Sequence, residues 1–210
     1  MKIAHGIVAA SLLAFAVSCG GSLQAQDIKG HEMLGIRVGG LATSGAFNAE
    51  FGGGSEIEIH FIHGITNGLG VDVALSSHNF GPSNNQEKNL AFFDRTDVNL
   101  QIFSMTAGMI FLRTARGRYT PTIEAGPGFY SVNTILHAGF SEAQKTDNHV
   151  GVYGGIGLLV RVAHTVSLNA SAKYHAVFVG TEPDDTVHFY TGESTARFLQ
   201  ISVGVMISSN

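Results

Sequence analysis

Alternation of side-chain character along residues 150–178 constrains the fold of this chain more than any other feature. Even positions are apolar or small, whereas odd positions are mostly glycine or polar residues such as Arg161 and Lys173. A period of two indicates β-strands, and a short turn at residues 163–165 divides the stretch into two. Each run exceeds ten residues, and a strand needs roughly 9–11 residues to cross a membrane. The stretch therefore predicts one hairpin of a transmembrane β-barrel.

The composition agrees with membrane strands and not with membrane helices. Hydrophobic residues make up 44% of the 210 residues and charged residues 13%, against about 25% charged in a typical soluble domain. After the N-terminus, no apolar run approaches the roughly 18 residues of a membrane helix. The formal net charge of -4, without a basic patch, indicates no nucleic-acid partner. The length suits one domain.

The first 25 residues have the features of a secretory signal peptide, so we expect the barrel domain to span residues 26–210. Lys2 supplies the positive start, and residues 7–17 form an apolar core too short to span a membrane. We expect cleavage after Ala25, which would leave no cysteine for a disulfide or thiol chemistry. The one cysteine, Cys19, follows a segment that loosely resembles a lipobox, so lipid attachment at Cys19 is the alternative.

The same alternation recurs along the chain and predicts eight strands. These cover residues 33–43, 55–65, 69–76, 97–112, 119–132, 150–162, 166–178 and 196–208. Connections are short after the second, fourth and sixth strands, and long after the first, third, fifth and seventh. Loops are thus expected at residues 77–96, 133–149 and 180–195. Short turns at one end and long loops at the other are typical of an up-and-down outer-membrane barrel.

The fourth expected strand is the least regular. Leu100 and Ile102 lie on one face, whereas Met105, Met109 and Phe111 lie on the other. Two explanations are open. A bulge shifts the register, or methionine and phenylalanine fill the lumen.

Charged residues lie on the faces opposite the apolar ones, and these are Arg37, Glu58, Asp72, Glu124, Arg161 and Lys173. Alternation alone fits either a lipid-facing or a water-facing exterior. Long strands and aromatic residues near the strand ends favour the membrane. The aromatic residues are Tyr119, Phe129, Tyr174 and Phe178. We therefore expect the six charges to pair inside a narrow lumen, with Glu124 and Arg161 as the best pair because their strands are neighbours.

The signal peptide, the eight strands, the glycine-rich segment 152–157 and the closing strand 198–207 resemble the outer-membrane β-barrel domain superfamily. That superfamily includes OmpA-like transmembrane domains and small barrels related to OmpW. The resemblance covers the whole mature chain and implies a location in the bacterial outer membrane, surrounded by its lipid. Such barrels usually end in an aromatic residue that the assembly machinery recognises, whereas this chain ends in Ser208, Ser209 and Asn210.

Catalytic and metal chemistry are not predicted. The histidines are scattered without ligand spacing, at His60, His63, His78, His137, His149, His164, His175 and His188. We therefore predict no metal and no cofactor. Ser171 and His175 lie four apart on one strand, and no His-x-Ser motif stands at a strand end, so no enzyme is expected.

The resulting functional prediction is a structural or surface-interaction barrel with a lumen plugged by paired charges. Loops 77–96 and 180–195 are the candidates for contact with a surface ligand, and we expect a monomer. One alternative is a narrow channel for ions or for small or apolar solutes, gated by the charges. The other is a soluble secreted barrel that binds an apolar ligand.

Overall fold

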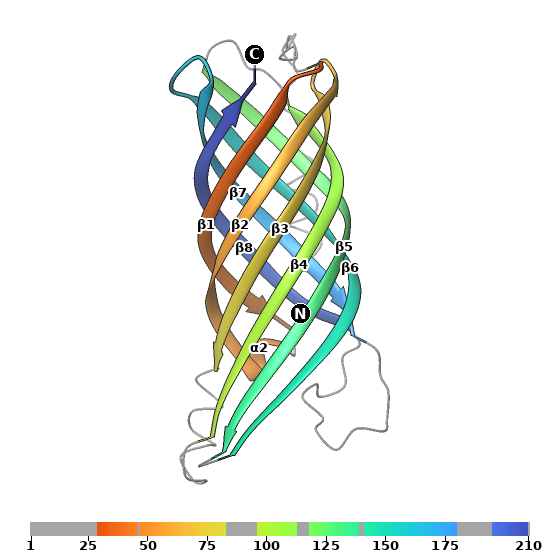
Figure 1. The fold of residues 1–210 in the computed structure, drawn as a ribbon, viewed down its shortest axis with the longest axis vertical. Coiled ribbons are helices and arrows are strands. Elements are labelled where there is room, and N and C mark those ends of the chain that lie inside the picture. The colour runs from red at the N-terminus through yellow and green to blue at the C-terminus, as the bar shows by residue number, and fades with distance from the viewer. Residues whose placement is uncertain are drawn as a thin grey trace.

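The described residues form a closed antiparallel barrel of eight strands with one short helix (Figure 1). The computed structural model describes residues 29–45, 47–82, 96–112, 118–138, 141–179 and 195–209. The strands are β1 (Glu32–Ser44), β2 (Phe51–Thr66), β3 (Leu69–Pro82), β4 (Thr96–Leu112), β5 (Tyr119–Ala138), β6 (Ser141–Arg161), β7 (Val166–Phe178) and β8 (Thr195–Ser208). Each strand pairs with its neighbours in sequence, and β8 pairs with β1. The predicted eight-stranded up-and-down barrel is confirmed.

Two other features complete the described chain. A one-turn helix, α2 (Phe47–Glu50), follows β1, and among the described residues no helix is long and apolar enough to cross a membrane. The expected signal peptide and Cys19 lie outside the described residues. The start of β1 and the end of β8 lie side by side. There the backbone N–H of Glu32 donates to Ser209 Oγ at 3.0 Å, and His31 Nδ1 lies 3.0 Å from the Ser209 carbonyl oxygen.

The strands are staggered, as closure of a barrel requires. The stagger can be traced from Glu32 by moving at each strand to the residue paired with it on the next strand. The path returns to β1 at Ala42 after passing through His63, Val71, Met109, Ala125, Gly154, Tyr174 and Leu199. The return point is ten residues beyond the start. Because the strands are tilted, side chains that meet inside the lumen come from different distances along their strands.

Apolar side chains cover the outside of the barrel. Leu34 is 57% exposed, and the exposure of Val150 and Val203 reaches 62% and 60%. The four predicted aromatic residues also point outward, at 40–57% exposure. An apolar surface of this extent suits lipid and would drive aggregation in water. The soluble-barrel alternative is therefore wrong, and the predicted lipid-facing exterior is confirmed.

β4 is regular, so neither explanation offered for it is correct. Its register with β3 runs without a shift from Leu69↔Phe111 to Phe80↔Leu100. Met105 and Phe111 point outward and are more than half exposed. The lumen is filled instead by Leu100 and Ile102, each 1% exposed.

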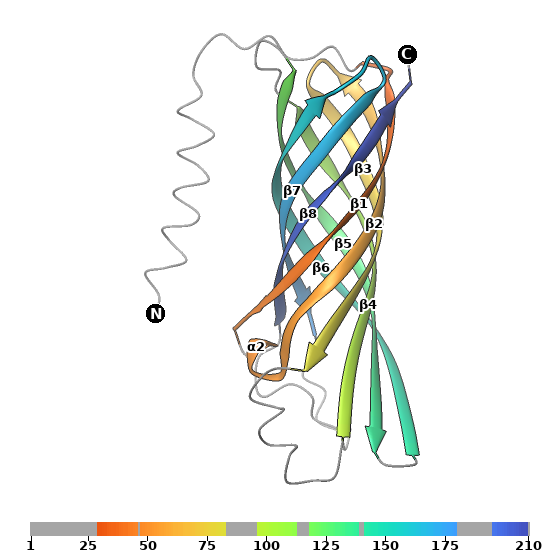
Figure 2. The same cartoon turned by 90° about the vertical axis from the view of Figure 1, so that its left-hand side faces the viewer.

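Three strands project beyond the rest of the barrel (Figure 2). The β5–β6 ladder extends to Ala138↔Ser141, and β4 follows β5 to Thr96↔Ala138, whereas β6 meets β7 only from Val150↔Phe178. The expectation of a loop at residues 133–149 is therefore wrong, because most of this segment is strand. β3 likewise extends to Pro82, and residues 83–95 and 180–194 of the other two predicted loops lie outside the described residues.

Candidate functional site in the barrel lumen

Glu58 of β2 is the centre of the charge network in the lumen. The Arg37 guanidinium bonds Glu58 Oε1 through two nitrogens, with Nε at 2.7 Å. Lys173 Nζ lies 3.3 and 3.2 Å from the two carboxylate oxygens. Ser76 Oγ and Gln200 Nε2 donate to Oε2 at 3.1 and 3.2 Å. Five donors from four strands thus surround one buried carboxylate.

Two further carboxylates share the same cations. Lys173 Nζ lies 3.3 Å from Glu124 Oε2 and 3.9 Å from Asp72 Oδ2. Arg37 Nη1 lies 3.6 Å from Glu124 Oε1, and His60 Nδ1 lies 3.6 Å from Asp72 Oδ1. The structure therefore brings together five of the six predicted charges, each with a residue exposure of 0–2%.

Arg161 is the sixth predicted charge and does not join them. It ends β6 and is exposed. Glu124 faces Gly155 in the β5–β6 register, six residues from Arg161. The proposed pairing of Glu124 with Arg161 is wrong, because adjacency of two strands does not specify their register.

Acidic groups outnumber basic ones among the described lumen residues. The carboxyl groups are Glu56, Glu58, Asp72 and Glu124, and the fixed cations are Arg37 and Lys173. Both carboxylate oxygens of Glu56 and of Asp72 lack a hydrogen-bond partner. Since unpaired buried charge is costly, the surplus favours protons or cations over anions in this lumen.

A chain of uncharged side chains continues from Glu58 toward the loop end. Gln200 Oε1 lies 3.0 Å from His175 Nε2, and His175 Nδ1 lies 2.9 Å from the Tyr130 hydroxyl. The His175 ring also stacks on Phe198, with ring centroids 4.6 Å apart. Sequence reasoning missed Gln200 and Tyr130, although both occupy inward positions of their strands. The sequence signal that could have identified Gln200 and Tyr130 is their polar side chain at an inward position within a membrane-spanning strand.

Ser171 and His175 each have their own hydrogen-bond partners in the lumen. Ser171 Oγ accepts from Arg37 Nη1 at 3.0 Å and lies 2.8 Å from Ser202 Oγ. His175 is engaged on both ring nitrogens by Tyr130 and Gln200. Both side chains therefore belong to the lumen packing.

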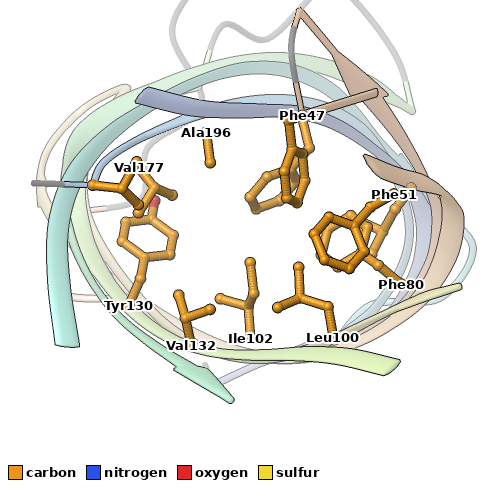
Figure 3. Packing of buried hydrophobic residues seen from close by; sticks show 12 residues of the cluster. Phe47, Phe51, Phe80, Leu100, Ile102, Tyr130, Val132, Val177 and Ala196 are labelled. Carbon is orange, nitrogen blue, oxygen red and sulfur yellow. The ribbon is translucent and has the colours of Figure 1, made fainter. Parts of the chain in front are cut away.

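Apolar clusters close the lumen at both ends. The loop-end cluster, partly labelled in Figure 3, consists of Leu41, Phe47, Phe51, Phe80, Leu100, Ile102, Tyr130, Val132, Val177, Val179, Ala196 and Phe198. The turn-end cluster, near the turns at residues 67–68 and 162–165, consists of Met33, Ile62, Ile110, Leu112, Leu159 and Met206. No residue of either cluster is more than 6% exposed. The charges are therefore shielded from solvent on both sides.

The comparisons with known proteins concern the fold. No protein-family model matches the chain, and no curated protein sequence matches it. The outer membrane protein OprG of Pseudomonas aeruginosa has a TM-score of 0.60 and 11% identity, over 90% of this chain and 100% of that one. Neisserial surface protein A has a TM-score of 0.55 and 16% identity, over 85% and 97%.

A third structure, the attachment invasion locus protein Ail of Yersinia pestis, has a TM-score of 0.53 and 13% identity, over 86% of this chain and 99% of Ail. Ail has also been solved in complex with the heparin analogue sucrose octasulfate. Together with the apolar exterior and the closed register, these similarities show that the chain has the fold of the small outer-membrane β-barrels.

Proposed function

We propose that the protein is a closed barrel of the bacterial outer membrane that presents its loop end for surface interactions. The observation that carries this proposal is the filled lumen. A charge network that is 0–2% exposed lies between two apolar clusters, in a barrel whose interior is just wide enough for side chains. The role is non-catalytic in this proposal, since Ser171 and His175 are held in separate structural contacts.

Recording in planar lipid bilayers tests the closed state. The purified full chain should give no stepwise conductance, and Glu124→Ala should be equally silent. Stepwise conductance that Glu124→Ala alters would contradict the proposal and support the narrow channel instead. A variant without heat-modifiable gel mobility is excluded from the comparison, because its barrel has not formed.

The projecting strands support the surface role. On these strands Gln144 Nε2 and Thr146 Oγ1 both donate to Asn133 Oδ1, at 3.0 and 3.3 Å. Over residues 141–149, one edge of β6 pairs with β5. The other edge, which pairs with β7 from Val150 onward, has no described strand beside it here. An exposed strand edge can accept a strand of another chain. The complex of Ail with a heparin analogue adds that a barrel of this fold can hold a ligand.

Labelling in whole cells tests which end faces outward. Gln144 is exposed on the projecting strands and His164 is exposed at the turn end, and the natural chain has one cysteine. A membrane-impermeant maleimide should modify Gln144→Cys in intact cells, and His164→Cys only after permeabilisation. The reverse pattern would place the projecting strands in the periplasm and contradict the proposal.

A further inference from the structure

The projecting edge of β6 has a sequence that is complementary to itself. We propose that this edge pairs antiparallel with the same edge of a second copy of the chain in the outer membrane of a neighbouring cell. The inference deepens the proposed surface role and rests on it, since the projecting strands must face outward. It names the partner as this chain itself and the interaction as a contact between cells.

The backbone groups of alternate β6 residues are directed at the projecting edge. Arg161 donates its N–H to Arg118 on the β5 side, whereas the next residue, Val162, donates to Val166 of β7. The register of β6 with β5 has no shift along the whole strand, so odd residues bond β5 and even residues face the other side. The even residues of the projecting edge include Gln144, Thr146 and Asn148. Their N–H and C=O groups therefore point to where a further strand would add.

Charge selects the register of a symmetric pair. Because the even residues of both copies must meet, such a pair is centred on one residue that lies opposite itself. A centre at Thr146 places Lys145 opposite Asp147 twice, in the non-hydrogen-bonded positions where side chains approach most closely. A centre at Lys145 would oppose two like charges, which is destabilising, and a centre at Gln144 would oppose neither charge to the other. The edge therefore favours Thr146 as the centre.

Lys145 and Asp147 are already placed for such a contact. Lys145 Nζ lies 3.4 Å from Asp147 Oδ2 within the chain, and both side chains are nearly half exposed. Since odd residues share one face of β6, two copies would bring four charges of alternating sign together on that face. The same register sets the amide side chains of Gln144 and Asn148 opposite each other. These pairings favour a second copy of the chain over an unrelated strand.

Strand direction decides which two copies can meet. Chains in one membrane point the same way, so their β6 strands all run from the loop end to the turn end (Figure 2). Antiparallel pairing needs chains of opposite orientation, which two facing membranes provide. Val150, where pairing with β7 begins, is nine residues beyond Ser141, so the edge projects roughly 30 Å along the strand. Each contact is weak by itself, and many copies on each cell make the attachment stable.

Mixing of two fluorescently labelled cell populations tests the pairing. Cells that carry the full chain should clump together, and cells without it should stay out of the clumps. Lys145→Asp and Asp147→Lys each oppose like charges, so clumping within either population should fall to the level of cells without the protein. A mixture of these two populations should clump again. The double variant Lys145→Asp/Asp147→Lys restores opposite charges and should clump alone at an unchanged net charge.

Variants at the centre test the register. Thr146→Pro removes the central N–H and should abolish clumping, whereas Thr146→Ala keeps that N–H and should clump. Thr146→Cys should form a disulfide between two chains under mild oxidation, because the central residues would have Cα atoms about 5.5 Å apart. Gln144→Cys, which would face Asn148, should not form one.

Three results would overturn the proposal. The first is clumping by Thr146→Pro, and the second is recruitment of cells that lack the protein, which would identify a different partner. The third is no clumping by wild-type cells although maleimide labels Gln144→Cys in intact cells, since the strands would then face outward without pairing. Failure of that labelling would overturn the proposed function as well. Heat-modifiable mobility of every variant excludes misfolding as the cause.

Discussion

Lys173 is the side chain on which the lumen network most depends. It is 0% exposed and its ammonium group contacts Glu58, Glu124 and Asp72. Removal of one partner from a buried ion pair leaves the other charge uncompensated, at a cost of about 3–5 kcal/mol. We therefore expect Lys173→Met to lower the free energy of unfolding by about that amount, measured by urea titration of heat-modifiable mobility.

Two variants make this prediction specific. Glu56→Gln removes one member of the acidic surplus, and neither oxygen of Glu56 has a hydrogen-bond partner. It should leave the urea midpoint unchanged or raise it. Lys145→Gln breaks an ion pair with Asp147 in which both side chains are nearly half exposed, and it should cost less than about 1 kcal/mol. Equal losses in Lys173→Met and Lys145→Gln would show that the lumen charges do not stabilise the barrel.

Gly108 shows how closely the lumen is packed. A Cβ at this position would lie 2.6 Å from the Tyr153 hydroxyl and 2.8 Å from the Ala125 carbonyl carbon. Gly108→Ala should cost about 1–3 kcal/mol through overpacking, measured by the same urea titration. Gly154→Ala is the control, because its Cβ would meet only the Glu124 carbonyl oxygen, at 3.9 Å. A large loss in both variants would indicate a general intolerance of alanine in the strands.

The sequence predicted which charged residues face the lumen, but it did not predict which of them pair with each other. Alternation placed Arg37, Glu58 and Lys173 on inward faces, because a period of two is a property of each strand alone. The same alternation gave Arg161 an inward phase without showing that it lies at the barrel rim. Partners depend on the register between strands, which no pattern within one strand reports. Thus Glu124 meets Lys173 from β7 and not Arg161 from β6.

At the scale of elements, the projecting part of β4, β5 and β6 was hidden from the sequence for a physical reason. Beyond the bilayer both faces of a strand contact water, so residues 133–149 lose the apolar alternation and resemble a loop. For β4 the pattern led to the opposite error, because apolar residues were expected to face lipid. Leu100 and Ile102 are apolar, yet they point inward because the lumen is apolar at the loop end.

Shortening the β5–β6 hairpin tests whether the projection is separable from the barrel. Replacement of residues 133–146 by Asn-Gly joins Val132 to Asp147, which already pair across the two strands. β4 remains paired with β3 up to Leu100, so we expect the urea midpoint to change little. Loss of heat-modifiable mobility would mean instead that the projecting strands are needed for the barrel to form.

At the scale of the whole molecule, the lumen has two apolar closures in series. Water and ions must pass both, so opening one alone should not produce a pore. We expect Ile102→Ala/Phe198→Ala at the loop end and Leu112→Ala/Met206→Ala at the turn end each to remain silent in bilayer recordings. The combined four-residue variant should conduct, with a cation preference in a KCl gradient, because the described lumen carries more carboxyl groups than cations. Conductance from either double variant alone would contradict this series arrangement.

Because Ser209 contacts Glu32, the first and last strands could be joined covalently without a change in the shape of the barrel. The chain could then start at a different strand. A short linker from Ser209 to Glu32 would close the ring of strands, and a cut directly after Leu112 would create a permuted chain. That chain would begin just before β5 and end with β4, and with the cut directly after Leu112 its penultimate residue would be Phe111. The permuted gene would then present an aromatic residue near its terminus to the assembly machinery while encoding the same barrel.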